Sequence, residues 1–337
     1  MSPSNSLAKK INLYTIIAVY FLILVGGIVR SMGAGMGCPD WPKCFGSYIP
    51  PANESLLPEN YEEIYVASRV KKNARLANTL DALGFEQLAD RVSNDPGIRS
   101  VTTFDVQKAW VEYINRLVGV VIGFLIILNI VFAFKFWSTD KRIVVLSVLS
   151  FILVVFQGWV GSLVVSTNLL PGFISFHMML ALLLVALLIA QRMLMNRGQT
   201  KISGKPLIAA LMVLFLVQIA FGVQVREEID LVKHLSGLVR SEWLEEVGMI
   251  FYIHRSYSLV IVGLVGLLVY QNWKQAKMTM ALKSLIGVIG LEIVLGIVLA
   301  YFGMPAFAQP LHLLLGTVAF GVIFYLFLSS NLNTKHS

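Results

Sequence analysis

Three histidines and one asparagine stand at matching places in the two halves of a very apolar chain. His254 and His312 each open a long apolar run in the second half, and Asn115 and His177 do so in the first half. Polar side chains inside membrane helices are costly, so they are candidates for function. Two neutral imidazoles facing each other in a helix bundle suit the two axial positions of a haem iron. For any one histidine, a hydrogen bond to a neighbouring helix or a proton relay is the alternative.

The pair in the first half predicts a different kind of site. Asparagine is a poor iron ligand, so a porphyrin between Asn115 and His177 would have one firm ligand and one weak or open position. Open positions are where metal chemistry takes place, whereas closed bis-histidine sites mostly transfer electrons. Glu112 stands three residues before Asn115, on the same face of a helix. Its carboxylate is a candidate acid, base or intermediate-stabilising group; the alternative is a helix-start residue favoured by the helix dipole.

Arginines near these residues are candidates for binding haem propionates. A guanidinium group pairs with a carboxylate through two parallel hydrogen bonds. The candidates are Arg30, Arg116, Arg226 and Arg255.

These residues stand in a chain that is too apolar for a soluble domain of its length. Of its 337 residues, 57% are hydrophobic and 14% are charged, and the mean hydropathy is +0.75. Such a composition is typical of a polytopic protein embedded in the lipid bilayer. Lys and Arg collect in the cytoplasmic loops of membrane proteins. The formal charge of +8 therefore gives no reason to expect a nucleic acid partner.

Eight apolar runs reach the length of about 20 residues that a membrane helix needs. They are continuously apolar, which favours helices over barrel strands, whose residues alternate. We therefore predict an all-α integral membrane protein with eight transmembrane helices. Lys9 and Lys10 precede the first run, which lacks a small-residue cleavage site, so we expect a retained span and not a signal peptide. The predicted spans are roughly residues 11–29, 113–136, 143–165, 173–192, 206–225, 249–270, 281–302 and 311–328.

Charge in the short loops predicts the orientation of the chain. The connections between spans two and three, four and five, and six and seven are basic, whereas residues 166–172 and 303–310 carry no charge. The positive-inside rule then places both termini in the cytoplasm. We expect a multi-pass protein of the cell (inner or cytoplasmic) membrane, with the three histidines and Asn115 near the outer ends of their helices.

The longest predicted loop, residues 31–107, lies on the outer side. Loops of this length usually have a function. Spaced apolar residues within 61–92 predict one or two amphipathic helices over the membrane surface or the bundle. Cys38 and Cys44 stand near the start of the loop, and because the outer side is oxidising, a disulfide between them is plausible. Two free thiols and a redox-active pair are the alternatives.

An internal repeat joins these features. Four spans separate equivalent positions, so both halves share one topology. We predict two pseudo-symmetric four-helix bundles, related by an axis along the membrane normal. The first half is residues 1–200, including the outer loop, and the second is residues 201–337. The matching stretches are residues 26–30 with 222–226, 113–116 with 252–255, and the pairs Gln157/His177 and Glu292/His312, each 20 residues apart.

With these motifs in place, the chain resembles the haem A synthase family of cytochrome oxidase assembly. The resemblance covers nearly the whole chain apart from the long outer loop. It departs from the family pattern at Asn115, where the first half of family members usually has Glu-x-x-His-Arg. The motifs that carry it are residues 26–44, Glu112-Tyr-Ile-Asn-Arg116, His177-Met-Met-Leu-Ala-Leu182, His254-Arg255 and Leu311-His312.

The resemblance implies a membrane oxidoreductase that oxidises a methyl group of haem O to the formyl group of haem A. Successive hydroxylations would give a hydrated aldehyde that loses water. It implies a haem b cofactor whose iron is held by His254 and His312. The substrate haem would lie near Glu112 and His177, and Cys38 and Cys44 can form a disulfide.

The implied partners are haem O, the haem O synthase that supplies it and an electron donor, and a homo-oligomer is an open possibility. A non-catalytic b-type haem protein, for electron transfer or haem handling in oxidase assembly, is the alternative function. A transporter is a third, suggested by the repeat alone. The retained Glu112 and the unequal ligand sets favour the enzyme.

Overall fold

The computed structural model describes residues 3–196, 202–235 and 237–332 of the chain. Within these residues the secondary structure is helical, apart from an isolated bridge between Cys44 and Ser47. Eight helices are long and apolar enough to cross a membrane, which confirms the predicted all-α membrane class. They are α1 (Pro3–Ser31), α4 (Val106–Ala133), α5 (Lys141–Ser166), α6 (Pro171–Asn196), α7 (Lys205–Leu235), α8 (Met249–Lys274), α9 (Met280–Tyr301) and α10 (Ala308–Leu332).

Several helices extend beyond the apolar runs that predicted them, because a helix continues for some turns after it leaves an apolar environment. α4 begins at Val106, seven residues before the predicted start, and α7 runs on to Leu235 through a stretch predicted as loop. Asn115, His177, His254 and His312 lie in the N-terminal halves of their helices.

The chain divides into two compact units. One comprises residues 29–121 and 155–178, and the other comprises residues 1–28, 122–154 and 179–337. The predicted boundary between residues 200 and 201 lies outside the described residues.

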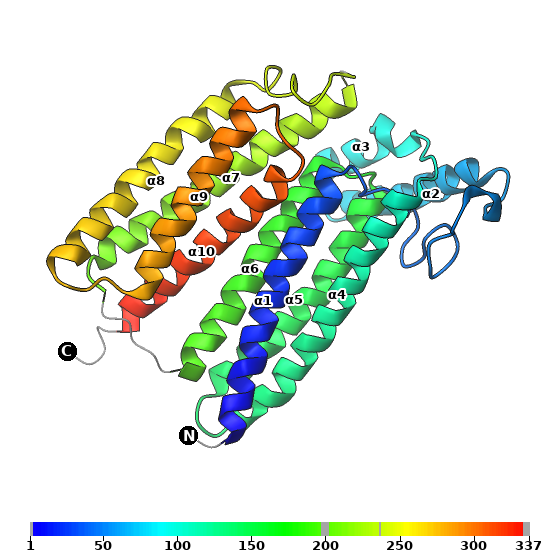
Figure 1. Ribbon diagram of the computed structural model, residues 1–337. Helices are drawn as coiled ribbons and strands as arrows, with labels where there is room; N and C mark the ends of the chain where they lie inside the picture. The colour runs from blue at the N-terminus through cyan, green and yellow to red at the C-terminus, as the bar shows by residue number, and fades with distance from the viewer. Residues whose placement is uncertain (1–2, 197–201, 236, 333–337) are drawn as a thin grey trace. The chain divides into compact units, whose positions relative to one another are not determined.

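The last four helices form one bundle within the second of these units (Figure 1). α7 packs along α8 and α10, and α9 packs along α10. The segment after α7 closes one end of the bundle through a buried cluster of Val225, Ile229, Trp243, Val247 and Met304. This segment therefore caps one end of the last four helices.

A polar cluster ties together one residue from each of α1, α4, α5 and α6. Gln191 is fully buried, and its Oε1 accepts hydrogen bonds from the amides of Asn12 (3.0 Å) and Asn129 (2.7 Å). Its Nε2 donates to the Ser147 hydroxyl at 2.6 Å. Buried amides without partners are costly, so this cluster favours one register of the four helices.

The long loop carries two helices, α2 (Tyr61–Ala82) and α3 (Glu86–Asn94), as predicted. The buried face of α2 is more polar than its apolar pattern indicates. Arg69 is 3% exposed and donates to the carbonyls of Ile98 and Ser100, while Asn73 donates to the Ser166 carbonyl at 2.6 Å. Apolar residues of the pattern such as Leu83 are exposed instead. Side-chain hydrogen bonds to the backbone therefore fix α2 in place.

Candidate functional site

His254 of α8 and His312 of α10 face each other within the last four helices. Their ring centroids lie 6.5 Å apart, and the ring planes are nearly perpendicular, at 85°. Both imidazoles are partly buried. The structure therefore brings together the two histidines that were predicted to share one site.

A polar side chain from a neighbouring helix lies against each of these rings. Nδ1 of His312 is 2.6 Å from Oε2 of Glu292 on α9, a close ion-pair contact whose angle departs from that of an aligned hydrogen bond. Gln218 of α7 donates from Nε2 to the backbone carbonyl of His254 at 3.1 Å, and the same nitrogen is 3.3 Å from Nδ1. Partners of this kind set the orientation and tautomer of a metal-binding histidine.

A glycine on an adjacent helix faces each histidine ring. A Cβ built on Gly222 would lie 3.0 Å from Cε1 of His254, and one on Gly296 would lie 3.8 Å from Cε1 of His312. In the first half, a Cβ on Gly161 would lie 3.6 Å from Cε1 of His177. Gly161 and Gly296 are equivalent in the sequence repeat, so the same glycine–histidine contact occurs twice.

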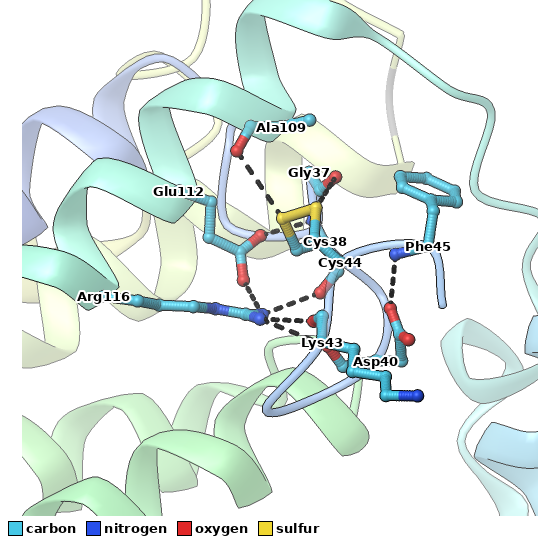
Figure 2. A network of polar contacts seen from close by, with 9 residues as sticks. All are labelled: Gly37, Cys38, Asp40, Lys43, Cys44, Phe45, Ala109, Glu112 and Arg116. Atoms are coloured by element: carbon cyan, nitrogen blue, oxygen red, sulfur yellow. Dashed lines mark hydrogen bonds and ion pairs between the residues drawn. A yellow bond between two sulfur atoms is a disulfide. The ribbon is translucent and has the colours of Figure 1, made fainter. Parts of the chain in front are cut away.

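Glu112 lies at the centre of a polar network between α4 and the loop that carries the cysteines (Figure 2). Its side chain is buried, and its Oε2 accepts a 2.8 Å hydrogen bond from the backbone N–H of Cys38. Its Oε1 is in close contact with the guanidinium of Arg116, one turn along the helix. The helix dipole acts most strongly in the first turn of a helix. Because α4 begins at Val106, Glu112 lies beyond that turn and is not a helix-start residue.

The side chain of Arg116 binds backbone carbonyls of the cysteine loop. Besides Glu112, its two terminal nitrogens donate to the carbonyls of Cys38 (2.8 Å), Asp40 (3.1 Å) and Lys43 (2.7 Å). Cys38 and Cys44 form a disulfide, as predicted. The Asp40 carboxylate accepts N–H bonds from Phe45 and Gly46, which turns the loop back on itself.

Aromatic residues of the outer loop cover this disulfide. Phe45 makes edge-to-face contacts with Tyr61, Tyr65 and Phe104. Burial, with a contribution from Asp40, raises the pKa of Tyr65 to about 12, so the phenol stays neutral. The cysteine loop is thus held by Arg116 on one side and by an apolar cluster on the other.

The other predicted residues of the first half have fewer partners. Oδ1 of Asn115 and Nδ1 of His177 are both buried and have no hydrogen-bond partner among the described residues. The same is true of Oε1 of Gln157, the residue equivalent to Glu292. Arg30 donates to the Met178 sulfur at 3.3 Å. No contact in the described part of the chain joins Asn115 to His177.

The two remaining arginines differ in their surroundings. Arg226 pairs with Asp230 at 2.7 Å and is in close contact with Gln309. Arg255 is exposed, with its guanidinium over the rings of Phe251 and Tyr252.

Three residues of these networks carried no predicted role. From sequence alone Glu292 only marks the repeat, and Gln218 and Asp40 do not stand out. For Glu292 a signal exists, because an acidic residue in an apolar helix stands 20 residues before His312. Gln218 and Asp40 act through contacts between segments that sequence spacing does not reveal.

Comparisons with known proteins place this chain in a family. A family model described as cytochrome oxidase assembly protein, COX15-CtaA, matches residues 9–79 and 97–324. "Heme A synthase" of Wolbachia sp. subsp. Brugia malayi is 24% identical, and the match covers 90% of this chain and 91% of that protein.

Other relatives match over shorter stretches. "Heme A synthase" of Shewanella oneidensis is 25% identical over 52% of this chain and 42% of its own length. The protein of the same name from Bartonella quintana is 26% identical over 67% of this chain and 60% of its own length. This chain thus spans less than half of the Shewanella protein but nearly all of the Wolbachia protein, and all three relatives carry the name of an enzyme.

Proposed function

Because the chain belongs to the COX15-CtaA family of cytochrome oxidase assembly proteins, as its motifs predicted, we propose that it is a membrane oxidoreductase that converts haem O into haem A. The observation that carries the proposal is the unequal pair of sites. The second half has two facing histidines with polar partners, whereas the first half has one histidine, one asparagine and a buried carboxylate.

The donor set of the second half fits a resident haem b. His254 and His312 would hold its iron, because they are two imidazoles that face each other with ring centroids 6.5 Å apart. Gly222 and Gly296 let the two rings pack closely against the neighbouring helices. A haem held by two histidines supplies single electrons to a reaction.

We assign the substrate haem to the first half, near His177 and Glu112. The buried and unpartnered polar atoms of Asn115, His177 and Gln157 support a polar ligand there. In this assignment His177 binds the haem O iron, and Asn115 leaves the opposite position weakly held. The substrate is thereby anchored without being locked in place.

Glu112 is the residue we assign to the chemistry. Conversion of the methyl group to a formyl group removes four electrons in two hydroxylations, which need an oxidant from outside this chain; the hydrated aldehyde then loses water, and each stage moves protons. A buried carboxylate can accept a proton at Oε or stabilise positive charge that develops beside it. The Cys38 N–H and Arg116 hold both oxygens in fixed positions, so Glu112 is oriented before the substrate arrives.

Propionate binding is the role we assign to the arginines. Arg255 has the most exposed guanidinium of the four. Arg116 is largely engaged by the cysteine loop and Glu112, so its contribution would pass through Nε or through rearrangement. Arg30 and Arg226 lie on the equivalent helices of the two halves.

The division into halves, the membrane orientation and the partners that we propose follow from the sequence. Residues 1–200 would form the substrate half and residues 201–337 the cofactor half, as two pseudo-symmetric bundles in the cell membrane. Both termini would be cytoplasmic and the histidines near the outer side. Haem O synthase would supply the substrate, and a separate electron donor would reduce the resident haem.

Pigment extraction from cells that make haem O, with and without this protein, tests the proposal. Haem A should appear only when the protein is present, and a Glu112→Gln variant expressed at the same level serves as the matched control. If the purified protein holds haem b but the cells gain no haem A, the protein is a haem carrier or assembly factor and the enzymatic proposal is wrong. This outcome must be distinguished from enzymatic activity, because the chain has Asn115 where the motif of the family has histidine.

A further inference from the structure

Glu292 is a partly buried acidic residue within a helix whose other residues, apart from Lys283 and Ser284 near its start, are apolar or glycine. It lies near the middle of α9, and its Oε2 is 2.6 Å from Nδ1 of His312 on α10. Among the described residues, the polar group in contact with this carboxylate is the ring of His312. Gly316, one turn beyond His312, allows the carboxylate to approach α10, because a Cβ there would lie 3.6 Å from Oε1.

A carboxylate in an apolar helix is costly, so its presence needs a compensating interaction. The ring nitrogen of His312 is the interaction that the structure provides. A carboxylate that accepts the Nδ1 proton fixes the tautomer, leaves Nε2 as the free nitrogen and makes the imidazole a stronger electron donor.

The first half of the chain contains a natural comparison. Gln157 stands 20 residues before His177, as Glu292 stands before His312, and the matching glycines Gly161 and Gly296 contact the equivalent rings. Gln157 has the same length and shape as glutamate but no charge. Nδ1 of His177 and Nδ1 of His312 both lack an aligned hydrogen bond in the described residues, but only His312 has a carboxylate oxygen 2.6 Å away. A carboxylate therefore lies beside one histidine of the repeat, and an uncharged amide stands at the equivalent position for the other.

We propose that Glu292 is a positioning residue that orients His312 and lowers the reduction potential of the haem bound there, while Gln157 leaves His177 a weaker donor. This rests on the proposed function, because it takes His312 as an iron ligand. A more basic imidazole stabilises ferric over ferrous iron, so the resident haem becomes the better reductant. A weaker donor at His177 suits a haem that must be released after the reaction.

Redox titration of the purified membrane protein, with its resident haem, tests this. Glu292→Gln keeps the shape of the side chain and removes its charge. We expect the variant to bind haem with a bis-histidine spectrum, and its midpoint potential to rise; each tenfold loss of ferric preference corresponds to about 59 mV for one electron. The low-spin EPR signal should also shift, since the near-perpendicular ring of His312 loses its restraint. Glu242→Gln, which removes an exposed charge from the same half, should change neither.

The outcomes separate the inference from the function on which it rests. A parent protein without a bis-histidine haem overturns the ligand assignment itself. A parent with that haem and a Glu292→Gln variant with unchanged potential and EPR signal overturns only the role of Glu292. Haem occupancy that falls in the variant but recovers with added haem supports positioning, because outer partners contribute about 10- to 100-fold to metal affinity. A folded variant that takes up no haem at any concentration counts against positioning.

Discussion

In the second half of the chain each candidate histidine touches a polar side chain, and in the first half neither Asn115 nor His177 does so through its buried polar atom. The first half instead has Glu112, tied to a disulfide loop, at the place where the second half has Phe251. In the second half, polar side chains contact two histidines, and in the first half, polar groups hold one carboxylate.

The differences between the halves occur together along the repeat. Where His254 has Gln218, the first half has Asn115 and, at the place of Gln218, Leu22. Where His312 has Glu292, His177 has Gln157. In the first pair the candidate ligand and its partner both differ between the halves, and in the second pair the partner alone differs while the histidine stays the same. These differences support the proposal of a fixed cofactor in one half and an exchangeable substrate in the other.

The largest expected effect is loss of the resident haem. His254→Ala or His312→Ala removes one of two strong ligands and should abolish the bis-histidine spectrum of the purified protein. His177→Ala should keep that spectrum and weaken binding of haem O, because it removes the only strong ligand of the first half. Haem content and visible spectra of the three variants decide this, and normal haem in both His254→Ala and His312→Ala would contradict the assignment.

The next effect separates turnover from haem content. Glu112→Gln keeps the size of the side chain but removes its capacity to accept a proton, so haem A formation should fall by about 100-fold or more. The b-type spectrum should be unchanged. Extracted pigments are measured beside spectra of the same membranes. Haem A at the parental rate would reduce Glu112 to an anchor for the cysteine loop.

The third prediction compares the two restraints on that loop. Arg116 donates three hydrogen bonds to loop carbonyls, and bonds to a charged group contribute about 1.5–3 kcal/mol each. The disulfide closes a very short loop, for which the loop-entropy model gives about 2 kcal/mol. Arg116→Lys should therefore impair haem A formation more than replacement of both cysteines by serine.

Haem A yield in the two variants tests this order, with thiol labelling to confirm the bridge in the parent. Labelling should fail at Cys38 and Cys44 until a reductant is added. A cysteine variant that is less active than Arg116→Lys would show that the disulfide has a role beyond holding the loop.

Sequence patterns predicted the membrane class, the eight spans and the loop helices, because hydrophobic length and period depend on local composition. They also paired His254 with His312, since a repeat places equivalent residues at equivalent depths. They missed the contacts of Glu292 and Gln218 and the clamp between Arg116 and loop carbonyls. Those contacts depend on helix rotation and on the path of a loop, and neither leaves a periodic signal. The polar face of α2, with Arg69 and Asn73, was missed because backbone acceptors from distant segments make burial of those groups favourable.

A smaller effect is expected from a substitution that makes the first half more like the second. Asn115→His gives the first half a second imidazole, so it should tighten binding of haem O or haem A and slow release. Purified protein should retain more of these haems, while total haem A per cell falls by a few-fold. His254→Asn, the reverse change, should make the second half release its haem. Equal retention by Asn115→His and the parent would mean that residue 115 does not face the iron.

The smallest expected effect concerns the glycines beside the rings. A Cβ on Gly222 would lie 3.0 Å from the His254 ring, too close without movement, whereas a Cβ on Gly296 would lie 3.8 Å from His312, an ordinary contact. Overpacking costs about 1–3 kcal/mol, and replacing a helical glycine by alanine stabilises the helix by about 1 kcal/mol. The two terms leave a net cost of about 0–2 kcal/mol for the fold in Gly222→Ala, and the displacement falls on a proposed iron ligand. Gly222→Ala should therefore lower the melting temperature by at most a few degrees, shift the EPR signal of the resident haem and lower haem affinity by a few-fold. Gly296→Ala should leave the signal unchanged. If the two alanines alter the signal equally, the distance between Cβ and ring is not what sets ligand orientation, and the closer packing around His254 has no bearing on how the two sites differ.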